Sequence, residues 1–241
     1  MPSRYHDILE KEKRWRRQLY RLFPNYQFSN DLYEALIKER LSAGGIWIDL
    51  GCGRNELVQE LASGGVFAVG LDVSRHPDLD LRARPFMKAD VCRLPLRDGS
   101  AHLLTGNMLF EHLPDPLCVL QEMRRALKPG GWIVLRTPNA LHPLNLMLRL
   151  ISERMKLKLL QRIYGISMQD IFPTYYRANL LGSLHRLCRR AGLDNVRICP
   201  VEDVHTAFGI FFFISLAYYL WVKITPLAFM RGNFVVLARK V

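Results

Sequence analysis

Short apolar runs alternate with longer amphipathic stretches along most of this chain. The short runs are typical of buried strands, and the longer periodic stretches are typical of helices. Apolar strands separated by amphipathic helices predict an α/β fold with a mainly parallel sheet that is covered on both faces. We expect strands near 45–50, 66–71, 86–89, 101–106, 131–136, 195–199 and 234–239, and helices near 30–41, 55–63, 115–127 and 177–191.

The first apolar run ends in an acid and then in a turn with two glycines. Residues 47–53 read Trp-Ile-Asp-Leu-Gly-Cys-Gly. Glycines adopt positive φ readily and let a ligand approach without a Cβ in its way, so the pattern predicts a nucleotide-type pocket at the carboxyl end of the first strand. A dinucleotide site has a third glycine three residues after the second, whereas Glu56 stands at that position here. A carboxylate there opposes a pyrophosphate but is harmless beside a sulfonium, which favours S-adenosylmethionine.

A second acid stands at the end of the next predicted strand. Asp72 follows Gly53 by nineteen residues, and a carboxylate can accept hydrogen bonds from both hydroxyls of a ribose. Nicotinamide-dependent oxidoreductases also carry an acid about 20 residues after their glycines, so Asp72 alone does not separate the two classes. Later segments do so by their order and crossover spacing: 87–91 (Met-Lys-Ala-Asp-Val), 94–100 (Leu-Pro-Leu-Arg-Asp-Gly-Ser), 111–116 (Glu-His-Leu-Pro-Asp-Pro) and 127–134 (Leu-Lys-Pro-Gly-Gly-Trp-Ile-Val).

This series of segments resembles the class I S-adenosylmethionine-dependent methyltransferases, in particular the small-molecule group related to quinone and sterol methyltransferases. The resemblance covers roughly residues 40–140, with weaker support over 174–200 and 233–240. It implies a Rossmann-like, seven-stranded, mainly parallel sheet with helices on both faces and an antiparallel last strand. It also implies S-adenosyl-L-methionine as the cofactor.

The residues that the resemblance assigns to the cofactor lie at or just after predicted strand ends. They are Asp49, Gly51 and Gly53 for the methionine end with Cys52 as a small filler, Asp72 for the ribose with Val73 beside it, Asp90 and Val91 for the adenine, and Asn107 for the methionine moiety or the transferred methyl. Plainer roles are turn glycines for Gly51 and Gly53, and helix N-caps for the two acids that follow the second and third strands.

A catalytic base is required only if the methyl acceptor must lose a proton. The best candidate is His112, because an imidazole has an ordinary pKa of about 6.5 and can remove a proton from a hydroxyl. The alternative is that Glu111 and His112 only shape the turn after the fourth strand. Further along, Tyr175, Tyr176 and Arg177 are candidates for contact with the substrate, although either tyrosine can instead belong to the core.

Length and cysteine content indicate one enzyme domain in a reducing compartment. The 241 residues suffice for one large α/β domain. We expect a basic amphipathic helix over 1–29 and a methyltransferase domain over 30–241, with a lid insertion over 140–176 and an apolar insertion over 201–232. The five cysteines are odd in number and show no paired spacing, so we expect neither a disulfide framework nor a metal site. The charged N-terminus lacks the apolar core of a signal peptide, which favours the cytoplasm.

The formal net charge of +12 is concentrated in two stretches that also carry large apolar side chains. Residues 1–25 hold seven basic and three acidic side chains, and residues 142–163 hold five basic side chains against Glu153. Basic amphipathic helices commonly lie on anionic membrane surfaces, so we expect peripheral attachment to the inner face of a membrane. Nucleic acid is a weaker expectation because no recognisable nucleic-acid module accompanies the charge. A solvated basic face of a lid helix is the third alternative.

The segment 207–222 contains sixteen residues without a charged side chain. As a helix it would reach about 24 Å, which is shorter than a hydrocarbon core of roughly 30 Å. In the resembled fold the strands on either side are antiparallel neighbours, so both ends lie on one side of any membrane and a single crossing is excluded. The segment can dip into the membrane interface, form the wall of an apolar substrate pocket, or pack against a second subunit of a homodimer.

These expectations converge on methyl transfer from S-adenosyl-L-methionine to a small, amphiphilic or lipid-linked acceptor at a membrane surface. The sequence does not determine whether oxygen, carbon or nitrogen receives the methyl group. Two other classes stay open, a nicotinamide-dependent oxidoreductase and a non-catalytic membrane adaptor on a methyltransferase scaffold. The oxidoreductase leaves the motifs over 90–100 and 111–116 unexplained, and an adaptor would not need intact cofactor positions.

Overall fold

The fold is described from a computed structural model that covers residues 16–62, 64–76, 79, 85–150, 155, 172–204, 209–225 and 227–241. The chain divides into two compact units. The sheet unit comprises Ser29–Pro138, Thr174–Cys199 and Phe234–Val241, and the insertion unit comprises Met1–Phe28, Asn139–Pro173 and Pro200–Asn233. Most of the predicted lid over 140–176, and the first fifteen residues, lie outside the described residues.

Seven strands form one sheet in the order β3-β2-β1-β4-β5-β7-β6. The strands are β1 (Ile46–Leu50), β2 (Phe67–Asp72), β3 (Phe86–Lys88), β4 (Ala101–Asn107), β5 (Leu127–Pro138), β6 (Asp194–Val201) and β7 (Asn233–Arg239). The first five strands pair in parallel, whereas β7 is antiparallel. The expected Rossmann-like sheet with an antiparallel last strand is confirmed.

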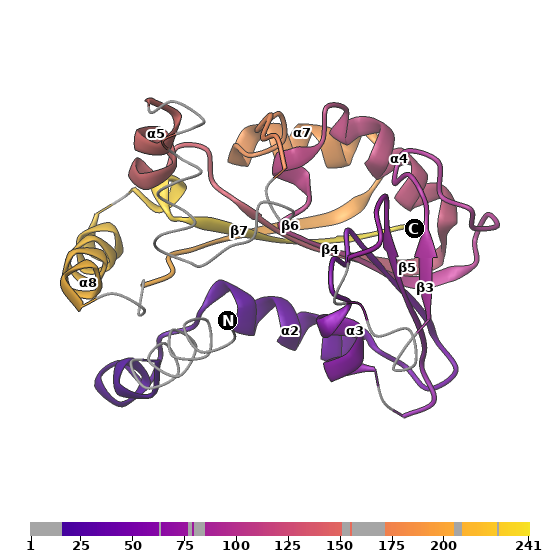
Figure 1. Ribbon diagram of the computed structural model, residues 1–241, viewed down its shortest axis with the longest axis horizontal. Helices are drawn as coiled ribbons and strands as arrows, with labels where there is room; N and C mark the ends of the chain where they lie inside the picture. Colours follow the sequence, from indigo (N-terminus) through magenta and orange to yellow (C-terminus); the bar gives the residue numbers. More distant parts are fainter. Residues whose placement is uncertain are drawn as a thin grey trace. The chain divides into compact units, whose positions relative to one another are not determined.

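Helices cover both faces of the sheet, as expected from the alternation of strands and helices. Figure 1 shows α2 (Ser29–Arg40) and α3 (Glu56–Leu61) on one face, and α4 (Pro116–Ala126) and α7 (Leu181–Arg190) on the other. Local capping fixes two of their ends. The Asp115 carboxylate accepts hydrogen bonds from the Leu117 and Cys118 amides at the start of α4, and Gly192, with φ 73°, follows α7 in the left-handed conformation.

Two elements begin about four residues away from their predicted starts. Strand β5 begins at Leu127 rather than near residue 131, because Leu127 already pairs with Ala101 and a register shift precedes Leu103. Helix α7 begins at Leu181 rather than near residue 177. The delay has a physical cause, since the buried Asn179 side chain donates to the Thr137 hydroxyl and to the Pro138 carbonyl and holds its segment out of the helix.

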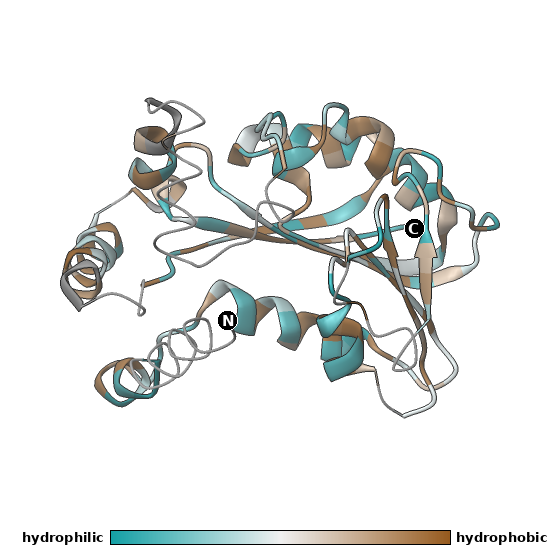
Figure 2. Ribbon diagram, viewed as in Figure 1, coloured by the Kyte–Doolittle hydropathy of each residue, from teal (hydrophilic) through white to brown (hydrophobic). Residues whose placement is uncertain are grey.

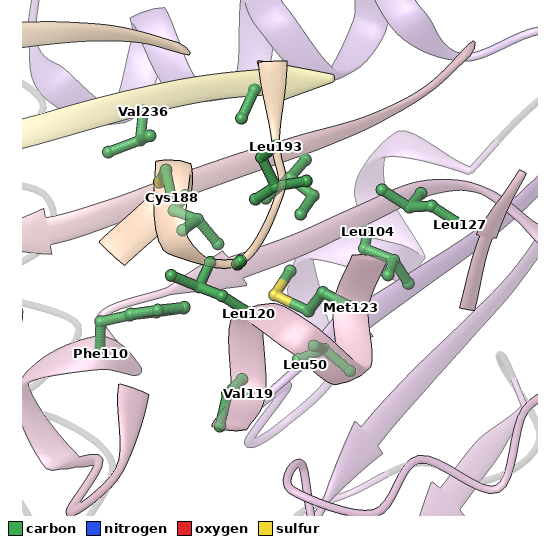
Figure 3. Close-up of a cluster of buried hydrophobic side chains, with 14 of the residues drawn as sticks. Leu50, Leu104, Phe110, Val119, Leu120, Met123, Leu127, Cys188, Leu193 and Val236 are labelled. Carbon is green, nitrogen blue, oxygen red and sulfur yellow. The ribbon is translucent and has the colours of Figure 1, made fainter. Parts of the chain in front are cut away.

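The core of the sheet unit lies between the sheet and helices α4 and α7. Leu50 and Leu104 from adjacent strands share one apolar cluster with Leu120 and Met123 of α4 and with Cys188 of α7, all of them buried. Figure 3 shows these side chains together. The alternation of buried positions along the strands and the apolar face of α4 therefore meet in one core, which fixes the strand ends that carry the site.

A second, aromatic core belongs to the insertion unit. Residues 16–22 are helical, and Leu19 packs in this cluster with Tyr26, Val204 and Phe212 of α8 (Gly209–Ile224). The Tyr26 hydroxyl donates to the Glu202 carbonyl and accepts from the Val204 amide, each at 2.7 Å. The unit also contains α5 (Pro143–Leu150) and the short helix η3 (Ala228–Met230). Within the described part of the chain, no helix combines the length and apolar character needed to cross a membrane.

Candidate active site

The candidate site lies along the edge of the sheet where the parallel strands β1, β2 and β4 end. The register places Leu50 of β1 beside Leu71 of β2 and beside Gly106 of β4. The residues that directly follow or end these strands therefore lie next to one another at one edge. Ligands of doubly wound sheets bind at this carboxyl edge, where the strand order reverses. The reversal here lies between β1 and β4.

The loop after β1 turns sharply because both of its glycines adopt positive φ. Gly51 has φ 67° and Gly53 has φ 52°, and the amides of Gly51 and Cys52 donate to the Leu71 carbonyl at 2.7 and 3.1 Å. A Cβ placed on Gly53 would meet nothing within 4 Å among the described residues. The loop backbone is therefore open to a ligand, as a cofactor at this edge requires. Burial raises the pKa of the Cys52 thiol well above its usual range, which agrees with an unreactive filler.

Asp72 connects the glycine loop to the turn after β2. Its Oδ2 accepts from the Gly53 amide at 3.0 Å, and its Oδ1 accepts from the Ser74 amide at 3.1 Å. Each carboxylate oxygen retains a second lone pair for hydrogen bonding. The side chain is thus fixed in orientation while it keeps acceptor capacity for a diol such as the ribose hydroxyls. The neighbouring Val73 is 61% exposed.

Asp49 is a buried carboxylate inside the sheet, directly below the glycine loop. Its Oδ1 accepts from the Thr105 hydroxyl at 2.6 Å, and the Trp47 indole donates to the same hydroxyl at 2.9 Å. Burial raises the pKa of Asp49 from 3.8 to about 7, the Thr105 hydrogen bond opposes this rise, and the negative charge of Asp72 adds to it. A cationic ligand placed nearby would favour the ionised form, so Asp49 fits the positive methionine end of the cofactor.

The raised pKa of Asp49 predicts a pH-dependent stability. The folded state binds the proton more tightly than the unfolded state, so this group lowers the free energy of unfolding as pH rises from about 4 to about 7. We expect Asp49→Asn to remove this loss. The free energy of unfolding of the variant, relative to that of the unmodified protein, should therefore be roughly 2 kcal/mol higher at pH 8 than at pH 5. Urea denaturation at both pH values measures the difference.

The matched control for this prediction is Asp98→Asn. The Asp98 side chain is 80% exposed, and we expect its substitution to have nearly the same effect at both pH values. Equal stability changes for Asp49→Asn at pH 5 and pH 8 would contradict the assignment of a raised pKa to Asp49.

Three further predicted cofactor residues lie just after β3 and at the end of β4. Asp90 is exposed and its Oδ1 accepts from the Cys92 amide at 2.9 Å, whereas Val91 is partly buried and packs against the core. Asn107 ends β4, and its Oδ1 accepts from the Arg136 guanidinium at 3.1 Å. The structure thus ties Asn107 to β5, while the Asp90 carboxylate remains open to solvent.

The short helix η1 (Phe110–His112) follows β4 and carries the candidate base. The Glu111 carboxylate is buried, and its Oε1 lies 3.9 Å from His112 Nε2. Burial raises the pKa of Glu111 from 4.5 to about 7, opposed mainly by hydrogen bonds, including one from the Thr137 hydroxyl, and by the Arg136 charge. The Leu109 side chain lies 3.0 Å from a Cβ built on Gly51, so η1 starts beside the glycine loop.

The predicted substrate residues 175–177 lie against η1. The amides of Tyr175 and Tyr176 donate to the Glu111 carbonyl at 2.7 and 3.2 Å, and the Arg177 guanidinium donates to the Pro114 carbonyl at 2.6 Å. The Tyr175 ring is 48% exposed. These contacts place the predicted substrate residues against η1, the element that carries the candidate base.

Several polar residues that build this edge were not among the predicted site residues. Asn55 is buried with φ 62°, and a Cβ on Gly70 of β2 would collide with its amide group. Thr105, Thr137 and Asn179 form the hydrogen bonds described above. Each is a lone polar residue next to a strong strand or turn pattern, which is the signal that could have found them.

The chain is similar in sequence to known methyltransferases. A family model described as a methyltransferase domain matches residues 13–198. The ubiquinone biosynthesis O-methyltransferase of Leptothrix cholodnii is 27% identical over 158 residues, covering 61% of the chain and 63% of that protein. The enzyme of the same name from Pseudomonas putida is 30% identical over 177 residues, covering 68% of the chain and 72% of that protein. The chain thus spans less than two thirds of the Leptothrix relative.

A solved structure shares the fold. Phosphoethanolamine N-methyltransferase 2 of Haemonchus contortus, in complex with S-adenosyl-L-methionine, has a TM-score of 0.56 at 17% identity and covers 87% of the chain and 52% of that protein. At this identity the likeness concerns the fold alone.

The described residues of the chain include no group of three or more His, Cys, Asp or Glu side chains that could hold a metal ion.

Proposed function

Because the chain belongs to the family of S-adenosyl-L-methionine-dependent methyltransferase domains, we propose that it methylates an oxygen of a small amphiphilic or lipid-linked acceptor at a membrane surface. The observation that carries the methyl-transfer chemistry is the arrangement of Asp72 against the open glycine loop, with the buried Asp49 beneath that loop. An oxygen acceptor is supported by the names of the two relatives, which are both O-methyltransferases.

The residues of the site have distinct tasks in this proposal. S-adenosyl-L-methionine supplies an electrophilic methyl group on a sulfonium. Asp72 binds the ribose hydroxyls, Asp90 binds the adenine amino group, and Asp49 provides negative charge near the methionine end. His112 accepts the proton of the acceptor hydroxyl. The site mainly holds the reacting atoms in line and excludes water, because the methyl group is already activated.

The membrane part of the proposal is supported by one face of α8. Phe213, Leu220 and Ile224 lie at i, i+7 and i+11 and therefore on the same side of the helix, and they are 62%, 40% and 84% exposed. Trp221 is also exposed on this helix, and such rings suit the headgroup level of a bilayer. In Figure 2 the ribbon of α8 carries hydrophobic colour along part of its length.

Exposed positive charge accompanies this apolar face within the insertion unit. Lys223 of α8 is exposed, and so are Arg17 and Arg21 of the helical residues 16–22. The Phe23 and Tyr219 rings, 6.3 Å apart, join that helical segment to α8 in one cluster. An apolar face with adjacent cations fits an anionic lipid surface better than it fits water or a neutral bilayer.

Flotation with vesicles tests the proposal. We expect the protein to float with phosphatidylglycerol-containing vesicles and to transfer label from radioactive S-adenosyl-L-methionine into a membrane lipid extract. The combined variant Phe213→Ser, Leu220→Ser and Ile224→Ser should reduce the floating fraction at least about tenfold. Each of the three apolar side chains contributes roughly 1.5–3 kcal/mol to membrane binding when it is buried in lipid.

Phe67→Ser is the matched control, because Phe67 is an equally exposed aromatic residue of the sheet unit. This variant should float like the unmodified protein. A protein that stays in the soluble fraction, with label only in water-soluble products, would refute the membrane acceptor.

A further inference from the structure

Glu111 is a buried carboxylate at the candidate site with no task in the proposed reaction. Its side chain is only 5% exposed. Burying a carboxylate is costly unless specific partners compensate. The Thr137 hydroxyl is one partner and donates to Glu111 Oε2 at 3.1 Å. The other carboxylate oxygen, Oε1, faces His112.

Two other chain segments, the end of β5 and residues 175–179, hold Glu111 in place. Thr137 of β5 is itself fixed, since its hydroxyl accepts from the Asn179 side chain at 2.7 Å. Asn179 also donates to the Pro138 carbonyl at 2.8 Å. The main chain of Glu111 accepts from the Tyr175 and Tyr176 amides. The hydrogen bonds from Asn179 to Thr137 and from Thr137 to Glu111 therefore fix one carboxylate oxygen. The other carboxylate oxygen lies toward His112.

His112 differs from Glu111 in its access to solvent. Its side chain is 28% exposed, and its Nε2 lies 3.9 Å from Glu111 Oε1. At this distance a carboxylate attracts an imidazole that has gained a proton and so favours the charged form of the ring. A purely structural carboxylate would not need to face the imidazole.

We propose that Glu111 is a positioning residue for the methyl transfer, orienting the His112 imidazole and balancing the positive charge that His112 gains. The inference rests on the proposed function, in which His112 is the base. In the reaction the acceptor O–H bond breaks and His112 takes the proton. The acceptor oxygen forms a bond to the methyl carbon, and the electron pair of the carbon–sulfur bond stays on sulfur. The proton later leaves His112 for water.

Charged side chains of two elements act on the Glu111 carboxylate. His112 faces it from η1, and Arg136 of β5 is close enough to favour its ionised form. The segment that carries Asn179 contributes neutral hydrogen-bond donors. Burial raises the pKa of Glu111 to about 7, so this carboxyl gains and loses a proton near neutral pH. This is the range in which a base must both accept and release one.

Histidine NMR on the full chain tests the inference without an acceptor. We expect Glu111→Gln to lower the titration midpoint of the His112 imidazole by about one pH unit, because the opposing charge is lost. The glutamine oxygen can still accept from Thr137, so the fold is kept. The His112 signals are assigned by their loss in His112→Asn. An unchanged midpoint would overturn the inference.

Glu202→Gln is the matched control. Glu202 is also buried and lies 3.2 Å from a histidine, His142 of the insertion unit. Its substitution should leave the His112 midpoint unchanged. If Glu111→Gln does not fold, the carboxyl ¹³C signal of Glu111 in His112→Asn serves instead. Loss of the imidazolium should raise the Glu111 midpoint, and an unchanged midpoint would again overturn the inference.

A different measurement tests the proposed function. Calorimetry with S-adenosyl-L-methionine reports cofactor binding, and we expect Glu111→Gln to bind it like the unmodified protein. Absent binding by the unmodified, folded protein would refute methyl transfer. Normal binding with an unshifted His112 midpoint would refute only the role of Glu111.

Discussion

Replacing Asp72 by alanine is expected to weaken the binding of S-adenosyl-L-methionine by a factor of about 100 or more. The Asp72 carboxylate is oriented by the Gly53 and Ser74 amides and can accept from both ribose hydroxyls. Hydrogen bonds to a charged group contribute about 1.5–3 kcal/mol each, so the loss of two corresponds to about 3 kcal/mol or more. Isothermal titration calorimetry measures the change in Kd.

Asp98→Ala provides the matched comparison for Asp72→Ala. Asp98 is an exposed carboxylate whose partner is Arg125, and exposed ion pairs contribute about 0–1 kcal/mol. We expect its Kd to stay within a factor of two of the unmodified protein. Circular dichroism establishes that both variants are folded. A Kd for Asp72→Ala within about threefold of the unmodified value would exclude the ribose contact.

Gly70→Ala is expected to destabilise the protein by about 3 kcal/mol, at the upper end of overpacking effects in cores. Gly70 lies inside β2, and an added Cβ would collide with the Asn55 side chain and with the Cys52 sulfur. Both of these residues belong to the glycine loop or its continuation, so relief of the collision would displace the loop. Urea denaturation measures the loss of stability, and calorimetry measures the weaker cofactor binding that should accompany it.

Two companion variants make this prediction specific. Gly182→Ala lies in α7, where an added Cβ meets nothing within 4 Å, and should stabilise the protein because alanine is the better helix former by about 1 kcal/mol. Asn55→Gly removes the colliding side chain, and glycine tolerates the positive φ at that position. The double variant Gly70→Ala, Asn55→Gly should recover part of the lost stability. Strict additivity of the two changes would show that the collision does not occur.

Much of the fold could be predicted from the sequence because glycines and acids mark the strand ends. The apolar runs that end at Leu50 and Leu71 became β1 and β2 within one residue of the expected bounds. The errors occurred where tertiary contacts decide the local structure. The start of α7 depends on the bonds from Asn179 to Thr137 and Pro138, and a helical hydrophobic pattern carries no information about these bonds.

The placement of the candidate site residues at strand ends was predictable from the sequence, and the hydrogen bonds between them were not. Asp72 was expected from its distance to the glycines, since that distance follows from the βαβ unit. The pairing of Asp49 with Thr105 depends on the register between β1 and β4, which places the two residues side by side. Residues more than fifty positions apart meet there, and no periodicity within either strand indicates such a contact. The hydrogen bonds that join Glu111, Thr137 and Asn179 likewise connect residues from different parts of the sequence.

The antiparallel return of β7 has a consequence for how this protein can vary. The strands β6 and β7 are neighbours in the sheet. The segment that contains α8 therefore begins and ends on two adjacent strands. The entropy of closing such a loop grows only slowly with its length. This segment can therefore lengthen, shorten or be exchanged while the strands that present Asp49 and Asp72 stay intact. The segment between β6 and β7 can in this way evolve separately from the strands that carry the proposed cofactor residues.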